Sequence, residues 1–175
     1  MGLFSFLKRD DSKEQAAKKE ADLELVSPVT GTLVPLTEVP DLVISEKLIG
    51  DGVAVVPDDS KILAPCAGTV SRLVASNNAF AIRTDSGVEI YVTFGIGTNS
   101  FSGVGITSSV SIGDTVNTGD VIVNIDMNKA AEYLESTITS MIVVNSSAKI
   151  SRVFSTSGKA VAGQTPCTWV ILADQ

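Results

Sequence analysis

The chain has 175 residues, 44% of them hydrophobic, with a mean hydropathy of +0.30. This length and composition predict one domain with a real core and exclude a disordered polyampholyte. The formal net charge of −7 argues against nucleic acid as a partner, because phosphate binding requires a basic surface. No apolar run approaches the roughly 18 residues that a membrane-spanning helix needs, and the N-terminus lacks a signal-peptide pattern. We therefore expect a cytoplasmic protein.

Residues 1–22 differ in composition from the rest and are predicted to be a flexible N-terminal tail. An apolar cluster is followed there by basic residues, and together they make a candidate membrane-contact segment: Leu3, Phe4, Phe6, Leu7, Lys8 and Arg9. In a helix, Leu3 and Leu7 would share one face, as in a weak interfacial anchor at the inner membrane face. The alternative is a solvated terminus.

From residue 23 to 175 the sequence indicates an all-β domain. Short Val- and Ile-rich runs alternate with Gly, Pro, Asp, Asn and Ser, which is typical of strands joined by turns. The predicted strands are 30–35, 53–56, 68–74, 79–84, 87–94, 121–125, 141–144 and 168–172. The segment 128–136 contains good helix formers and is the one predicted short helix of the domain. These elements predict an antiparallel β-sandwich.

Alternation and a short repeat add detail to this sandwich. Strict alternation in 87–94 assigns Val88 and Ile90 to one face and Glu89 and Tyr91 to the other. The motif Pro-x-x-Gly-Thr followed by an apolar residue occurs at 28–33 and again 37 residues later. The repeat indicates a sheet built from two related halves.

The two cysteines, Cys66 and Cys167, are too few for a disulfide framework or a metal cluster. Each stands beside a proline in apolar, strand-like surroundings, so both are predicted to be buried thiols. No pattern indicates a metal or an organic cofactor. The glycine-rich stretch 95–105 is not followed by the lysine and helix start of a phosphate-binding loop, and is predicted to be a surface connection.

Three segments carry a specific family resemblance: VPDLVISEKLIGDGVAV, SNNAFAI and DSGVEIYVTFGI. They resemble the glucose-type enzyme IIA of the bacterial phosphoenolpyruvate-dependent sugar phosphotransferase system, and the similarity runs from residue 1 to about 172. The resemblance implies an antiparallel β-sandwich of the duplicated, hybrid-motif type, with a shallow apolar depression around two histidines. It also implies the histidine phosphocarrier protein and the sugar transporter components IIB and IIC as partners, together with regulated transport and metabolic enzymes.

The two family histidines fall at Asn78 and Thr93, and the chain contains no histidine at all. In the family, the histidine at the second position carries the phosphoryl group and the first stabilises the phosphorylated state. The same pair can hold zinc with a target enzyme. An asparagine amide is not a nucleophile, and a threonine hydroxyl needs a base and would form a stable ester. We therefore expect no active catalytic residue.

The surroundings of these two positions also depart from the family pattern. Gly97 stands where the family has an aspartate, and position 44 lacks the usual aromatic residue. Because the whole neighbourhood differs, we interpret the chain as a natural paralogue rather than an ordinary enzyme IIA inactivated by engineering. Residues 42–44, in a predicted loop, are expected to be an exposed apolar patch, whereas a core role is left open for Leu48 and Ile49. The predicted partner-binding residues are Asp41, Leu42, Val43, Ile44, Leu48, Ile49, Ser76, Asn78, Phe80, Tyr91, Thr93 and Gly97.

These observations predict a regulatory binding module of the sugar phosphotransferase system that cannot carry phosphohistidine. One alternative is an active phosphocarrier that uses Thr93, Ser76, Cys66 or an aspartate. A second is a structural protein on the same scaffold. A zinc hydrolase on a related β-scaffold would need histidine ligands, which this chain lacks.

Overall fold

The computed structural model describes residues 3–174, with side chains from residue 11 onward. Its helical elements are α1 (Leu3–Lys19), η1 (Leu36–Glu38), α2 (Leu42–Ser45) and α3 (Met127–Ala131). Its strands are β1 (Leu23–Val26), β2 (Gly31–Val34), β3 (Gly50–Pro57), β4 (Lys61–Leu63), β5 (Gly68–Leu73), β6 (Ala79–Arg83), β7 (Glu89–Ile96), β8 (Ile106–Ser108), β9 (Thr115–Val116), β10 (Val121–Ile125), β11 (Ser136–Val144), β12 (Ile150–Ser155), β13 (Gly158–Ala160) and β14 (Pro166–Leu172). The predicted antiparallel β-sandwich is confirmed, and each predicted strand overlaps an observed one.

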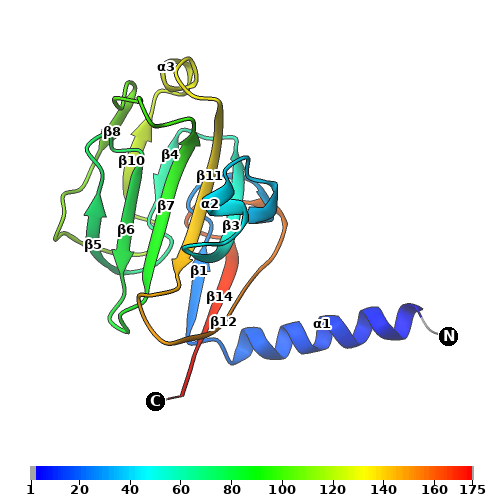
Figure 1. The fold of residues 1–175 in the computed structure, drawn as a ribbon. Helices are drawn as coiled ribbons and strands as arrows, with labels where there is room; N and C mark the ends of the chain where they lie inside the picture. Colours follow the sequence, from blue (N-terminus) through cyan, green and yellow to red (C-terminus); the bar gives the residue numbers. More distant parts are fainter. Residues whose placement is uncertain (1–2, 175) are drawn as a thin grey trace.

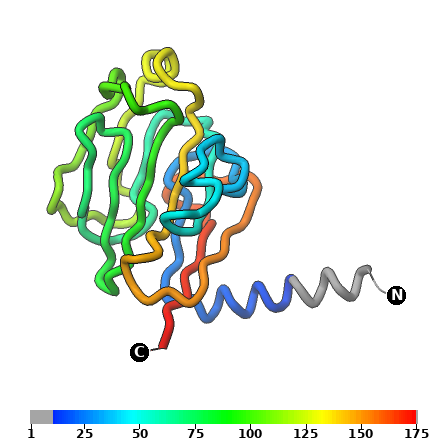
Figure 2. Tube along the Cα trace, in the orientation of Figure 1, coloured from blue at the N-terminus to red at the C-terminus, as the bar shows by residue number. Residues whose placement is uncertain are grey.

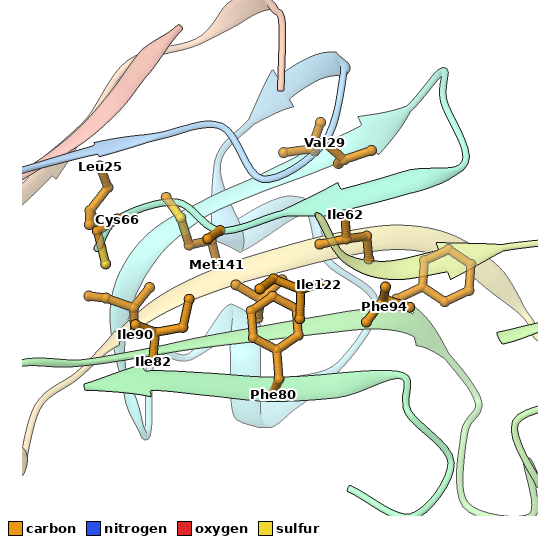
Figure 3. Packing of buried hydrophobic residues seen from close by; sticks show 14 of the residues in the cluster. Leu25, Val29, Ile62, Cys66, Phe80, Ile82, Ile90, Phe94, Ile122 and Met141 are labelled. Carbon is orange, nitrogen blue, oxygen red and sulfur yellow. The ribbon is translucent and has the colours of Figure 1, made fainter. Parts of the chain in front are cut away.

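One layer of the sandwich is an eight-stranded sheet in the order β13-β2-β3-β11-β7-β6-β5-β9. Two three-stranded sheets, β1-β14-β12 and β4-β10-β8, face it (Figure 1). All pairings within residues 3–174 are antiparallel. The main core fills the space between the layers, where Phe80, Ile90 and Phe94 meet side chains such as Leu25 and Ile122 (Figure 3).

The predicted alternation in β7 is confirmed. Val88, Ile90, Val92 and Phe94 are fully buried on the inner face. Glu89, Tyr91 and Thr93 are only partly buried and lie on the opposite side of the strand. We call this second side of the eight-stranded sheet the outer face.

The repeated motif marks two equivalent halves. Gly31 and Gly68 begin β2 and β5, and each lies under a carbonyl of the neighbouring strand. A Cβ at Gly31 would lie 2.1 Å from the Val56 oxygen, and one at Gly68 would lie 2.4 Å from the Arg83 oxygen. Both positions therefore need glycine for the same reason, a close approach of backbones. Each half has four strands in the same order, β13-β2-β3-β11 and β9-β5-β6-β7, so β11 and β7 meet at the centre.

The helices differ from expectation in extent. α3 ends at Ala131 rather than near residue 136, because the following residues turn and the Glu135 N–H donates to the Ile96 carbonyl at 2.9 Å.

The segment 1–22 contains α1, whose C-terminal part contacts the domain: Ala17 is buried and the Lys18 ammonium lies 4.4 Å from the centre of the Trp169 ring. The side chains of the proposed membrane-contact residues 3–9 lie outside the described part of the chain (grey in Figure 2). No helix in residues 3–174 is both long and apolar enough to cross a membrane.

Both cysteines are buried, as predicted. Cys66 and Cys167 belong to the main core and are not bonded to each other. Burial raises the pKa of each thiol to about 12, because the apolar surroundings penalise the thiolate. Both therefore stay protonated near neutral pH, and Cys66 is a poor candidate for a nucleophile.

Candidate functional site

Asn78 and Thr93 lie side by side, although 15 residues separate them in the sequence. Thr93 on β7 is the cross-strand partner of Ala79 at the start of β6, and the Phe94 N–H donates to the Asn78 carbonyl at 2.7 Å. Asn78 follows a tight turn in which Asn77 adopts a left-handed conformation (φ 58°), which asparagine tolerates better than most residues. The antiparallel pairing of β6 with β7 therefore places both residues in one site.

The side chain of Asn78 is buried and fully engaged. Its Nδ2 donates to the Phe94 carbonyl at 3.2 Å, and its Oδ1 accepts a hydrogen bond from the Ser76 hydroxyl. Only 7% of the residue is exposed. Both polar ends of the amide are thus held by the protein, so Asn78 is fixed in orientation. The amide is also not nucleophilic, because its nitrogen lone pair is delocalised into the carbonyl group.

Thr93 faces a second hydroxyl across the sheet. Its partner on β11 is Ser140, which is 1% exposed. The Ser140 Oγ is the one buried side-chain nitrogen or oxygen of residues 11–174 that has no hydrogen-bond partner. Sequence reasoning missed Ser140, although a serine directly before the apolar run 141–144 was the available signal. Asn78, Thr93 and Ser140 supply hydrogen-bonding groups, and none of them titrates near neutral pH.

An apolar rim stands next to this site. It consists of Leu42 and Val43 on α2 and Leu48 in the following turn, which are 76%, 46% and 64% exposed. The expected exposure of Leu42 and Val43 is confirmed, and Leu48, for which a core role was left open, lies on the surface. Such a patch bordered by polar groups is typical of a protein-binding surface.

Two predicted surface residues lie in the interior instead. Ile44 is 7% exposed because α2 is a helical turn that directs it inward, against a second cluster that includes Val39, Ala54 and Ile142. The expectation that Ile44 belongs to the exposed patch was wrong. Ile49, for which a core role was left open, is half-buried against the same cluster. Phe80 is 1% exposed and points into the main core (Figure 3), so its side chain offers no surface to a partner.

Other predicted site residues do reach the outer face or its edge. Tyr91 is half-buried on β7, on the same side as Thr93, and Ser76 is half-buried at the turn before β6. Gly97 has φ +78°, and a Cβ there would lie 2.7 Å from Cγ of Glu135. A glycine adopts this backbone conformation without strain, whereas a side chain here would crowd Glu135.

Asp41 has a structural role that the sequence prediction did not assign. Its Oδ1 accepts a hydrogen bond from the Ile44 N–H at 3.2 Å and so caps the N-terminus of α2. We expect Asp41→Ala to lower the free energy of unfolding by about 1 kcal/mol, the usual loss on removing an N-cap, whereas Asp41→Asn keeps the acceptor and should change it little. Urea denaturation of the two variants measures the difference. Equal losses in both would show that the charge, and not the cap, is what matters at this position.

The comparisons with known proteins point to one family. Residues 23–149 match the family model of the phosphoenolpyruvate-dependent sugar phosphotransferase system, EIIA 1. A glucose-specific EIIA component of Haemophilus influenzae is 36% identical over 165 residues, which cover 94% of this chain and 96% of that protein. A glucose-specific EIIA component of Borreliella burgdorferi is 40% identical over 129 residues, covering 74% and 68%.

Two further matches concern a longer protein and a solved structure. An N-acetylglucosamine-specific EIICBA component of Klebsiella pneumoniae is 40% identical over 156 residues, which cover 89% of this chain but 24% of that protein. The glucose permease IIA of Mycoplasma capricolum has the same fold, with a TM-score of 0.76 and 31% identity over 83% of this chain and 94% of its own. The chain therefore belongs to the EIIA family of the phosphoenolpyruvate-dependent sugar phosphotransferase system.

Proposed function

We propose that this chain is an EIIA protein that binds partners of the sugar phosphotransferase system without carrying a phosphoryl group, and so acts as a regulatory binding module. The observation that carries the proposal is the content of its site. Two uncharged polar residues, Asn78 and Thr93, occupy the positions where the family resemblance places histidines, and the chain contains no histidine. The Asn78 amide is already hydrogen-bonded at both ends within the protein.

The chemistry of the site supports loss of the relay step. A carrier must accept a phosphoryl group in a form labile enough to pass on, which an imidazole nitrogen does and an amide does not. A threonine needs an adjacent base, and the Thr93 neighbours across the sheet are Ala79 and Ser140. The Ser76 hydroxyl donates to Asn78, and the Cys66 thiol is buried and protonated. These features disfavour Thr93, Ser76 and Cys66 as substitute nucleophiles.

The apolar rim supports retention of docking. Leu42, Val43 and Leu48 expose large apolar side chains beside the polar site, and burying them against a partner would remove apolar area from water. The relatives that are EIICBA components carry EIIA-like sequence in the same chain as other components of a sugar-specific system. We infer that the histidine phosphocarrier protein and a IIB or IIC transporter component are the partners of this chain. A molecule that never changes its phosphorylation state would hold such partners constitutively.

The docking half of the proposal is tested by titrating the labelled chain with the histidine phosphocarrier protein and measuring the dissociation constant by NMR. We expect Leu42→Asp to weaken binding about tenfold or more, because a charge is placed in the centre of an apolar contact. The matched control is Ile112→Asp, which makes the same change at a residue 63% exposed, beside β9 at the far edge of the sheet. Equal effects of the two variants, or no binding of the wild-type chain, would overturn the proposal.

A further inference from the structure

A cavity on the outer face adjoins the Asn78–Thr93 site through Tyr91, which lies two residues before Thr93 on β7. It has a volume of about 620 Å³ and is lined by residues of β5, β6, β7 and the β11–β12 turn, among them Arg72, Arg83, Glu89, Tyr91 and Ser146. This size is within the range of sites that hold small molecules. We propose that this cavity binds a small hydroxylated organic anion.

Neighbouring strands of the outer face bring a guanidinium group and a phenol to the cavity. Tyr91, Ala81 and Arg72 are consecutive cross-strand partners on β7, β6 and β5. Ala81 between them is fully buried, whereas Arg72 and Tyr91 both line the cavity, with their Cα atoms roughly 10 Å apart across the strands. A ligand in the cavity would therefore be within reach of both a guanidinium group and a phenol.

The charges of the lining distinguish an anion site from a neutral one. Arg83 Nη2 pairs with Glu89 Oε2 at 2.8 Å, so these two charges compensate each other. Arg72, in contrast, has no carboxylate within 4 Å among the residues whose side chains the structure describes. The cavity thus has one unpaired cation in a protein whose net charge is −7. A guanidinium group is suited to bidentate hydrogen bonding with a phosphate or a carboxylate.

The opposite end of the cavity is suited to hydroxyl groups. The Arg83–Glu89 pair lies two residues along the strands from the row of Arg72 and Tyr91, roughly 7 Å away. The ion pair with Arg83 uses Oε2 of Glu89, and in the described part of the chain Oε1 has no hydrogen-bond partner. A carboxylate oxygen accepts from a hydroxyl group, and the exposed Ser146 at the rim can donate or accept. A ligand that places an anionic group at Arg72 and hydroxyl groups at Glu89 would be a sugar phosphate or a sugar acid.

The proposal is tested by NMR titration of the full chain at about 0.15 M salt, which screens non-specific charge attraction. The four probes are glucose 6-phosphate, gluconate, inorganic phosphate and glucose. We expect at least one of the two organic anions to shift the amide signals of residues 72, 83, 89 and 91, and the one that binds identifies the anionic head. Inorganic phosphate and glucose, each of which has one of the two required features, are expected to bind at least about tenfold more weakly.

Two arginine variants provide the matched comparison. Arg72→Gln removes the unpaired cation from an exposed position and is expected to weaken binding about tenfold or more. Arg152→Gln removes the same charge on β12, where the guanidinium lies over the Phe154 ring, and is expected to leave affinity unchanged. Binding of neither organic anion, equal binding of inorganic phosphate, or equal loss in both variants would overturn the proposal. None of these outcomes depends on phosphotransferase partners, so the inference stands or fails separately from the proposed function.

Discussion

The double variant Asn78→His/Thr93→His is expected to accept a phosphoryl group that the wild-type chain refuses. With phosphoenolpyruvate, enzyme I and the histidine phosphocarrier protein, the variant should gain an acid-labile adduct of about 80 Da, the mass of one phosphoryl group. Transfer between two imidazoles breaks one P–N bond and forms another, so no further reactant is needed. Mass spectrometry of the intact chain at neutral pH, before and after acid treatment, measures the change.

The two single variants show how much each position contributes to phosphorylation of the double variant. Thr93 is half-buried on the outer face and can present an imidazole to a partner, whereas Asn78 is 7% exposed and its amide is held by Ser76 and the Phe94 carbonyl. We therefore expect Thr93→His alone to take up label more slowly than the double variant, and Asn78→His alone to take up none. An acid-labile adduct on the wild-type chain would refute the proposed function. A double variant that binds the phosphocarrier yet stays unlabelled would show that the site no longer has acceptor geometry.

The second large effect is expected from Phe80→Ala, which should lower the free energy of unfolding by about 3–5 kcal/mol. Phe80 is 1% exposed and contacts the main core from β6, so truncation removes buried apolar area and leaves a cavity. A loss of this size is a large part of the roughly 5–15 kcal/mol by which a domain is stable. Urea denaturation followed by tryptophan fluorescence measures it, since Trp169 is the single tryptophan of the chain.

The control for Phe80 is Leu42→Ala on α2, which is 76% exposed and should change the free energy of unfolding by no more than about 0.5 kcal/mol. The two residues were both predicted from sequence to contact partners. The structure assigns only Leu42 to the surface, so the pair distinguishes a core role from a binding role. A Phe80→Ala variant of wild-type stability that fails to bind the phosphocarrier would contradict the burial argument.

Alternation and turn residues were sufficient to predict the strands that contribute most to the core. β7 is the clearest case, because one side chain in two faces the interior from Glu89 to Phe94. β12 and β13 were missed because much of their surface is exposed, so their sequences carry little apolar pattern. β9 is only two residues long, too short for any periodicity.

The helical turn at α2 was missed for a different reason. Its four residues, Leu42–Ser45, include two that are β-branched, and the turn is held by the Asp41 cap and by Ile44 against the second cluster. These contacts are tertiary, so a local pattern does not reveal them. The inward direction of Ile44 follows from the same turn, which explains why an extended loop was the wrong basis for predicting its exposure.

The candidate site was predictable only where the family resemblance supplied a correspondence. Asn78 and Thr93 were identified in this way, and the structure places them side by side. Ser140 lies on β11, far from either residue in the sequence, and the strand order β11-β7-β6-β5 brings it to the same sheet as Arg72. No spacing rule predicts that β11 pairs with β7, because β8, β9 and β10 lie between them in the sequence.

The pairing of β1 with β14 brings the two ends of the domain together. The Asp22 N–H donates to the Val170 carbonyl at 2.9 Å, and the Leu172 N–H donates to Asp22 Oδ2 at 2.7 Å. The two ends of the domain therefore leave from the same place on its surface. Because β14 is the last strand of the chain, it must be synthesised before β1 can pair with it. A domain with adjacent termini can be inserted into a larger protein as a unit. It can also be circularly permuted at an exposed turn without breaking a strand of the central sheet.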